Sequence, residues 1–507
     1  MFKKILIANR GEIAVRIIRA CRELGISPVT VYSEADRRAL HVRMADEAVR
    51  IGPSNLGESY LKIENVLQAA IQIGADAIHP GYGFLSENAE FAKAVQKAGL
   101  IFIGPPPEAI RLMGDKGKAR QRMQSAGVPV IPGYQGENDL NVFHSEAGKI
   151  GYPILVKAAT GGGGKGMRVV RQESELDESV AAAQREALHA FGDSRLILEQ
   201  YIPNARHIEF QILADHHGNI LHFYERECSI QRRHQKIIEE TPATILDDDL
   251  RSQMGAAAIS AAASVGYQNA GTVEFIFNPR SRSFYFLEMN TRLQVEHPIT
   301  EFVTGIDLAQ WQIRIASGER LPFSQAQIIQ RGHAIECRLY AEDPSNGFLP
   351  FSGRLLRFIE PKGPGVRVDS GVASGDEITV HYDPLIAKLI AYAADRPSAI
   401  RKMKSALEGT VLLGLTTNAL FLQDVLSHPE FQSGDIYTTW VEERLQDWQP
   451  PQCSLPPEVI VAAALTEFPQ VTLPPSDHLS GQEKVYLQSG RDPFTPWQIG
   501  NSYRVGE

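Results

Sequence analysis

The amino-acid sequence predicts an α/β domain followed by an α+β region. Strand-like and helix-like segments alternate as far as about residue 113, which is typical of a parallel sheet covered by helices. Beyond this point, pairs of strand-like segments follow one another across short polar turns, with helical segments between the pairs. The 507 residues are enough for roughly three domains of about 150 residues each.

The N-terminal region begins with an apolar strand at 4–8 and a polar turn at 9–12, after which apolar residues recur at helical spacing. Further strands are expected at 29–32, 77–79 and 100–104. This alternation predicts a doubly wound parallel sheet. Because the region has no GxGxxG motif, it does not indicate a dinucleotide site, and a scaffold role is the simplest interpretation.

The region after Met113 contains two expected hairpins. One pairs 208–213 with 221–224, the other pairs 272–277 with 284–289, and an alanine-rich helix at about 250–265 lies between them. Hairpins combined with helices in this order predict an α+β domain.

A third region extends from about residue 332 to about 445. Short strands are expected at 366–368 and 378–380, and a helix at 398–407. Nine residues from position 450 onward are proline, against 30 in the whole chain, so this last part is expected to be a linker-like tail.

Composition excludes several classes of protein. Hydrophobic residues make up 43% and charged residues 22%, and the formal charge of −9 does not suit a protein that neutralises a nucleic-acid backbone. No window approaches the ~18 apolar residues of a membrane span, and the N-terminus does not resemble a signal peptide. The 4 cysteines include no CxxC pair, so we expect a reduced cytoplasmic protein without a disulfide framework or zinc site.

The glycine-rich stretch 160–166 is expected at the tip of a hairpin formed by 152–158 and 167–170. It is not a Walker A loop, because Lys165 is followed by glycine and then by a strand. Glycines allow backbone N–H groups to approach phosphate oxygens closely. Lys157 lies in an apolar strand and needs an anionic partner there. These features favour phosphate binding over the alternative of a mobile surface loop.

Two glutamates stand inside otherwise apolar strands. Glu274 lies in TVEFIF and Glu288 in FYFLEMN, and strand geometry places Glu288 and Asn290 on one face. Three oxygen ligands that converge near phosphates would suit Mg²⁺ or Mn²⁺. The alternative is that these carboxylates form structural ion pairs with arginines.

The stretch from Asn290 to His297 concentrates polar side chains. Arg292 offers a fork of donors that matches a planar oxyanion, and Glu296 is a candidate general base nearby. The alternative is a solvent-exposed polar turn.

The stretch from Arg226 to Lys236 is locally basic in an acidic protein. It is either a solvated cationic face or an anion pocket that uses His234 and Lys236.

Ten stretches together resemble the biotin carboxylase family of the ATP-grasp superfamily. In chain order they are KILIANRGEIAVRIIRA, IHPGYGFLSEN, LMGDK, KAATGGGGKGMRVV, RHIEFQILAD, ECSIQRRHQKIIEE, GTVEF, FLEMNTRLQVEHPITE, GHAIECRLYAED and YDPLIAKLI. They cover roughly residues 2 to 445. The resemblance implies a preATP-grasp domain with a Rossmann-like parallel sheet at 1–113 and an ATP-grasp domain at 114–330, with a mobile glycine-rich lid at about 131–203. A biotin carboxylase C-terminal domain at 331–446 and a proline-rich extension at 447–507, possibly the start of a linker to a further carboxylase domain, would complete the chain.

The resemblance also implies a role for individual residues. The nucleotide would contact Lys116, Lys157, Gly162, Gly163, Gly164, Glu199, Gln200, Ile202, His207, Gln231, His234 and Ile276. The metal-binding positions would be Glu274, Glu288 and Asn290, the bicarbonate pocket Lys236, Arg292, Gln294, Val295 and Glu296, and the biotin-facing residues Tyr82 and Arg338. Relatives commonly carry lysine where this chain has Gln200, which should not abolish ATP binding because adenine is contacted there mainly by backbone.

The implied activity is that of a ligase that carboxylates biotin N1 with ATP and bicarbonate, the first half-reaction of an acyl-CoA carboxylase. Glu296 would deprotonate bicarbonate while Lys236 and Arg292 hold its oxygens, and two Mg²⁺ or Mn²⁺ ions would bind with ATP. Arg338 would stabilise the enolate-like oxygen of biotin. The expected setting is acetyl-CoA carboxylase and fatty acid biosynthesis. The alternatives are a pyruvate- or urea-type carboxylase module, a different ATP-grasp ligase, or an inactive scaffold subunit.

Biotin is expected to arrive as a carrier-bound substrate, because the nearest approach to a carrier motif, Lys402-Met403-Lys404, has the wrong order. Expected partners are a biotin carboxyl carrier protein or domain, a carboxyltransferase and a second copy of the chain in a homodimer, with no nucleic acid and no membrane. The stretches 491–497 and 502–505 faintly resemble the segment that follows this module in longer acyl-CoA carboxylase α chains. The chain is therefore either a fragment or a short natural version.

Overall fold

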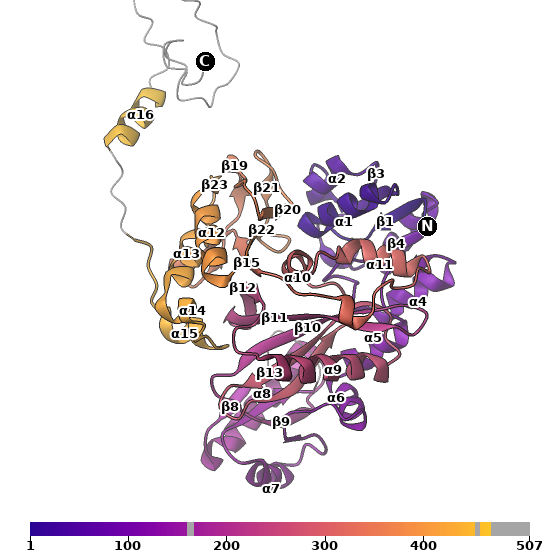
Figure 1. Ribbon diagram of the computed structural model, residues 1–507, viewed down its shortest axis with the longest axis vertical. Coiled ribbons are helices and arrows are strands. Elements are labelled where there is room, and N and C mark those ends of the chain that lie inside the picture. The colour runs from indigo at the N-terminus through magenta and orange to yellow at the C-terminus, as the bar shows by residue number, and fades with distance from the viewer. Residues whose placement is uncertain (160–166, 452–456, 468–507) are drawn as a thin grey trace, which may run out of the picture. The chain divides into compact units, whose positions relative to one another are not determined.

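The computed structural model describes residues 1–159, 167–451 and 457–467 (Figure 1). The chain divides into two compact units, Met1–Trp448 and Gln449–Glu507, and the described part of the second contains helix α16 (Pro457–Glu467). The glycine-rich stretch with Gly162, Gly163 and Gly164, and the stretches 491–497 and 502–505, lie outside the described residues.

The first unit begins with a five-stranded sheet in the order β3-β2-β1-β4-β5, and every adjacent pair is parallel. Its strands are β1 (Lys4–Ile7), β2 (Ser27–Ser33), β3 (Glu47–Gly52), β4 (Ala77–His79) and β5 (Ile101–Phe102). The predicted parallel sheet is confirmed. The strand expected at 100–104 is shorter than predicted.

Alternate residues of β1 enter two different cores. Ile5 and Ile7 pack with helix α1 (Gly11–Glu23), whereas Leu6 packs with α3 (Ile63–Gln72) and α4 (Ala89–Lys97). Helices therefore cover both faces, as parallel strands require. The strand order reverses between β1 and β4, so the loops that follow these two strands form the crevice where such sheets bind ligands.

A small four-stranded sheet in the order β6-β9-β7-β8 corresponds to the segment expected to be a lid. It comprises β6 (Gly133–Tyr134), β7 (Ile154–Ala158), β8 (Arg168–Val170) and β9 (Leu196–Gln200). Together with helices α7 (Leu140–Ile150) and α8 (Leu176–Phe191) it encloses its own hydrophobic core, which includes Phe143, Val156 and Leu198. The predicted pairing of the strands on either side of the glycine-rich stretch is confirmed, since β7 and β8 are antiparallel.

An eight-stranded antiparallel sheet dominates the remainder of the unit, in the order β14-β13-β10-β11-β12-β15-β22-β20. Its strands are β10 (Arg206–Ala214), β11 (Ile220–Arg232), β12 (Gln235–Thr241), β13 (Asn269–Asn278), β14 (Ser283–Asn290), β15 (His333–Tyr340), β20 (Val366–Ser370) and β22 (Leu385–Ala393). Both predicted hairpins are present as β10–β11 and β13–β14. The predicted alanine-rich helix is α9 (Asp248–Ser264), which packs on β10 and β11 and crosses this sheet in Figure 1.

This sheet continues across residue 330, where the sequence predicts a domain boundary. β12 pairs with β15, and Glu239 lies opposite Glu336 in that register. The C-terminal strands are therefore added to the edge of the central sheet. Helices α12 (Arg396–Glu408) and α13 (Ala419–Ser427) complete the core beyond them, around Met403, Phe421 and Trp440.

Smaller expectations have mixed outcomes. The strand expected at 378–380 is only β21 (Glu377–Ile378), and Val380 is 80% exposed, which leaves it without the packing that a strand needs. Cys21, Cys228 and Cys337 are buried free thiols. Among the described residues, no helix has the length and apolar character required to cross a bilayer.

Candidate functional site

A cavity of about 1000 Å³ lies in the unit Met1–Trp448, and residues from all three predicted regions line it. Of the site residues that the sequence predicts, the following contribute to its wall: Tyr82, Lys116, Lys157, Glu199, Gln200, Ile202, His207, Gln231, His234, Lys236, Glu274, Ile276, Glu288, Asn290, Arg292, Gln294, Val295 and Arg338. Glu296 lies behind the wall and is 0% exposed. The structure thus gathers nearly all of the predicted residues around one space.

Lys157 has the anionic partner that its apolar strand requires. It is 8% exposed on β7, and its Nζ lies 2.5 Å from Oε2 of Glu199 on the neighbouring strand β9. Arg120 contacts the other oxygen of Glu199 at 3.3 Å. The carboxylate of Glu199 is therefore occupied by two cations.

Glu274 and Glu288 lie directly opposite each other on β13 and β14. Asn290 joins them, because its Nδ2 donates to Glu274 Oε1 at 2.7 Å. Partial burial raises the pKa of Glu288, whose side chain is 41% exposed, and the charge of Glu274 raises it further, although Lys116 Nζ lies 4.0 Å away. Two opposed carboxylates that repel each other at a cavity wall are a donor set that a hard divalent cation would neutralise. The residues therefore fit a Mg²⁺ or Mn²⁺ site.

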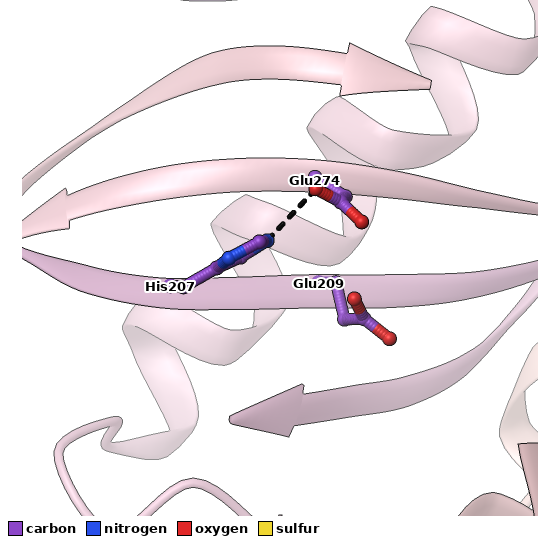
Figure 2. A group of neighbouring side chains, drawn as sticks. All are labelled: His207, Glu209 and Glu274. Carbon is purple, nitrogen blue, oxygen red and sulfur yellow. Dashed lines mark ion pairs between the residues drawn. The ribbon is translucent and has the colours of Figure 1, made fainter. Parts of the chain in front are cut away.

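Figure 2 shows a second group of potential ligands, formed by His207, Glu209 and Glu274 on the adjacent strands β10 and β13. His207 Nε2 lies 2.9 Å from Glu274 Oε2. However, Lys236 Nζ lies 2.5 Å from Glu209 and 2.8 Å from Glu274, so an ammonium already balances both carboxylates. Burial acts to raise the pKa of Glu274, but Lys236 and His207 outweigh it and hold the pKa below its usual range. The pair Glu274 and Glu288 therefore has less of its negative charge balanced by cations than the pair Glu209 and Glu274.

Glu296 is held between two cations. Lys236 Nζ contacts its Oε1 at 2.8 Å, and Arg338 Nη2 contacts its Oε2 at 3.0 Å. Burial acts to raise the pKa of Glu296, but Lys236, Arg338 and Arg226 together lower it well below its usual value. The side chain is therefore an ionised carboxylate, which is the protonation state that a general base needs.

Arg292 has other partners. Its Nε lies 2.8 Å from Glu87, its Nη1 donates to Gln294 and its Nη2 donates to Asn290, both at 3.0 Å. The arginine that contacts Glu296 is Arg338, which also binds Glu239 with an Nε–Oε1 distance of 2.6 Å. Arg292 thus presents its guanidinium to the cavity beside Gln294, where an anion could bind.

The two alternatives for the basic stretch 226–236 apply to different residues. Arg226 is 0% exposed and bonds Glu209 at 2.6 Å, so the solvated-face interpretation is wrong for it. Arg233 and His234 form the exposed turn between β11 and β12, both with positive φ, as a two-residue hairpin of type I′ requires. His234 reaches the cavity from that turn, and Gln231 lies beside it on β11, 2.7 Å from His207 Nδ1.

Several charged residues of the site were not predicted. Arg10, Glu12, Arg233 and Asp383 line the cavity, and Glu87, Glu209, Arg226 and Glu239 form ion pairs with site residues or with one another. Glu209 could have been found, because His207, Glu209 and Gln211 alternate with apolar residues along β10, and all of them are buried. A strand with two buried faces, one of them polar, requires partners on that polar face.

Comparisons with known proteins agree with this geometry. Residues 1–110 match the family model described as biotin carboxylase, N-terminal domain. Residues 115–324 match the carbamoyl-phosphate synthase L chain, ATP binding domain, and residues 336–443 match the biotin carboxylase C-terminal domain.

Three relatives illustrate the range of similarity. The mitochondrial methylcrotonoyl-CoA carboxylase subunit alpha of Mus musculus is 50% identical over 504 residues, which cover 99% of this chain and 69% of the relative. The biotin carboxylase of Nostoc sp. is 54% identical over 443 residues, covering 87% of this chain and 99% of the relative. The corresponding subunit from Oryza sativa is covered over 61% of its length. This chain thus spans somewhat under three quarters of the methylcrotonoyl-CoA carboxylase subunits and nearly the full length of the shorter relative.

A solved structure is similar over the same range. It is the biotin carboxylase domain dimer of the Hydrogenobacter thermophilus 2-oxoglutarate carboxylase, in complex with MgADP, ADP and bicarbonate. Its TM-score is 0.85 at 47% identity, and the match covers 89% of this chain and 100% of that chain.

Proposed function

The chain belongs to the biotin carboxylase family of ligases, and from this premise we propose that it carboxylates N1 of carrier-bound biotin with ATP and bicarbonate. The observation that carries the proposal is the placement of Glu296 between Lys236 and Arg338, two cations that line the same cavity as the opposed pair Glu274 and Glu288. The ADP and bicarbonate bound by the Hydrogenobacter domain support the same choice of substrates.

The first step needs a base and a cationic pocket. Bicarbonate is a weak nucleophile, and Glu296 would accept its proton while Lys236 and Arg292 hold its oxygens. The carbonate would attack the γ-phosphorus of ATP, the bond from that phosphorus to the β,γ-bridging oxygen would break, and ADP would leave as carboxyphosphate forms. Lys116 and Lys157 would stabilise the charge of the phosphates. Glu274, Glu288 and Asn290 would hold Mg²⁺ or Mn²⁺, which lowers the electrostatic cost of phosphoryl transfer when bound.

The second step transfers CO₂ to biotin. Carboxyphosphate would break into CO₂ and a phosphate basic enough to take the proton from biotin N1. Arg338 would stabilise the enolate-like oxygen of the ureido ring, and Tyr82 would contact biotin as well. Exclusion of water by the segment 131–203, acting as a lid, would limit hydrolysis of carboxyphosphate.

The proposed setting follows the named relatives. The sequence suggested acetyl-CoA carboxylase and fatty acid biosynthesis, but several of the most similar subunits are named methylcrotonoyl-CoA carboxylase subunits instead. We therefore infer that the biotin carboxylated here serves a branched acyl-CoA acceptor. The partners would be a biotin carboxyl carrier, a carboxyltransferase and a second copy of this chain, as the dimeric Hydrogenobacter domain suggests.

The deciding experiment measures phosphate release from Mg-ATP with and without bicarbonate, and with and without free biotin. We expect slow bicarbonate-dependent release that biotin accelerates, together with labelled carboxybiotin when the bicarbonate carries ¹⁴C. ATP cleavage that needs a different carboxylic acid would favour another ATP-grasp ligase. ATP binding without any cleavage would favour a scaffold subunit.

A further inference from the structure

Lys388 belongs to none of the residue sets assigned above, yet it is fully buried next to the site. It lies on β22, and its side chain is 0% exposed. Its ammonium group carries three N–H donors, which need acceptors because a buried unpaired charge is strongly unfavourable. The acceptors that it meets come from three segments that are distant in the sequence.

The first acceptor is a main-chain carbonyl. Lys388 Nζ donates to the oxygen of Val295 at 2.7 Å. This carbonyl belongs to the peptide group that joins Val295 to Glu296, the residue whose carboxylate binds Lys236 and Arg338. A hydrogen bond to a neutral carbonyl does not balance the positive charge of Lys388. It does fix the orientation of the peptide plane from which Glu296 extends.

The second acceptor is Glu12, in the first turn of α1. Its Oε1 lies 3.2 Å from Lys388 Nζ and also accepts a hydrogen bond from the hydroxyl of Tyr82. Glu12 is 5% exposed, so this shared carboxylate oxygen is a buried link between Lys388 and Tyr82. Asp369 on β20, with an oxygen 3.9 Å from Nζ, adds a second negative charge.

Lys388 lies directly opposite Arg338 in the β15–β22 register. Like charges in directly opposed positions destabilise a sheet unless each has its own counter-ions. Here Arg338 contacts Glu239 and Glu296, whereas Lys388 contacts Glu12 and Asp369. Arg338 and Lys388, which are neighbours in one sheet, thus contact different sets of carboxylates around the cavity.

We propose that Lys388 is a positioning residue for biotin carboxylation. It holds the Val295 carbonyl directly and the Tyr82 hydroxyl through Glu12, and so sets the distance between the bicarbonate-facing and biotin-facing walls. Val295, Glu12 and Tyr82 line the cavity, whereas Lys388 is not among the described lining residues, so it acts through its neighbours. This inference rests on the proposed function.

The test compares Lys388→Met with the matched control Lys402→Met. Lys402 on α12 also donates to main-chain carbonyls, those of Pro364 at 2.9 Å and Tyr392 at 2.7 Å, but it does not line the cavity in the described structure. For Lys388→Met we expect KM for bicarbonate and for free biotin to rise about tenfold, because displaced Val295 and Tyr82 would bind these two substrates less tightly. KM for ATP should stay within about twofold, and the Lys402→Met values should match the parent.

The double variant Lys388→Met with Glu12→Gln removes both charges of the pair, so it leaves no uncompensated glutamate at position 12. It should show the same rise in the two KM values, and it provides the measurement if the single variant does not fold. Parental KM values for bicarbonate and biotin in either folded variant would overturn the proposed role of Lys388. Absence of bicarbonate-dependent ATP cleavage in the parent protein would instead refute the proposed function.

Discussion

Lys236 and Glu296, 60 positions apart in the chain, form an ion pair of 2.8 Å at the centre of the site. The same ammonium group contacts Glu209 at 2.5 Å and Glu274 at 2.8 Å. One lysine therefore connects the candidate base to a candidate metal ligand. A change in the charge of Glu296 or of Glu274 will therefore alter the electrostatic environment of the other carboxylate, because both contact Lys236.

Glu296→Gln should abolish bicarbonate-dependent ATP cleavage while ATP binding is retained. The amide preserves the shape of the side chain but cannot accept a proton, and Lys236 keeps Glu209 and Glu274 as counter-ions. We expect a loss of about 10²–10⁴-fold in rate, the usual contribution of a general base, with a nucleotide Kd within about twofold of the parent. Steady-state phosphate release and nucleotide titration measure the two quantities. A rate within severalfold of the parent would remove Glu296 from the base role.

Glu288→Gln and Glu288→Lys should both abolish turnover with Mg-ATP, and the lysine variant should also weaken nucleotide binding by placing a positive charge at a metal position. Because Glu288 is repelled by Glu274, the glutamine variant should unfold with a free energy equal to or slightly above that of the parent. Urea denaturation and phosphate release test these statements together. Near-parental turnover in either variant would contradict the metal assignment.

Arg338→Gln should impair carboxylation of biotin more than bicarbonate-dependent ATP cleavage. Its removal also leaves Glu239 with one cation fewer, so a loss of stability is expected. Arg396→Gln is the matched control, because Arg396 is also a largely buried partner of a glutamate, Glu240, at 2.6 Å. The ratio of carboxybiotin to phosphate should fall only for Arg338→Gln. An equal fall in both variants would indicate a purely structural role.

The stability of the protein should depend on Glu240 in a pH-dependent manner. Burial acts to raise the pKa of Glu240, but His333 and Arg396 outweigh it and lower the pKa from 4.5 to about 2. A folded-state pKa below the unfolded value stabilises the protein above pH 4.5, by about 3 kcal/mol, and this stabilisation is lost as the pH falls toward 2.

The comparison of the parent with Glu240→Gln tests this dependence. The difference in unfolding free energy between the parent and Glu240→Gln should shrink as the pH falls below about 4.5. Glu34→Gln is the control, because its arginine partners are exposed, and its effect should be small throughout. A Glu240→Gln difference that does not change with acid would show that the ion pairs contribute nothing through protonation.

Local patterns in the sequence predicted the hairpins and the parallel sheet because each depends on neighbouring residues and on period-2 or helical spacing. They also predicted Lys157, whose position in an apolar strand indicated a missing partner. Lys388 also lies in an apolar strand, LIAKLIAYA, and therefore also needs a partner. Its partners are distant in the sequence, however: Glu12 lies hundreds of residues before it and Val295 tens of residues before it. The long-range register of β12 with β15 and of β15 with β22 decides which charges meet, and no local pattern specifies it.

The pairing of β12 with β15 has a practical consequence for anyone who divides this chain. A fragment that stops near residue 330 would leave β12 with an open row of amide and carbonyl groups, an edge that invites other chains to pair with it. It would also lack Arg338 and Arg396, so Glu296 and Glu240 would each lose an ion-pair partner. An isolated nucleotide-binding fragment should therefore aggregate, and a soluble catalytic piece has to extend through the helices that follow β22.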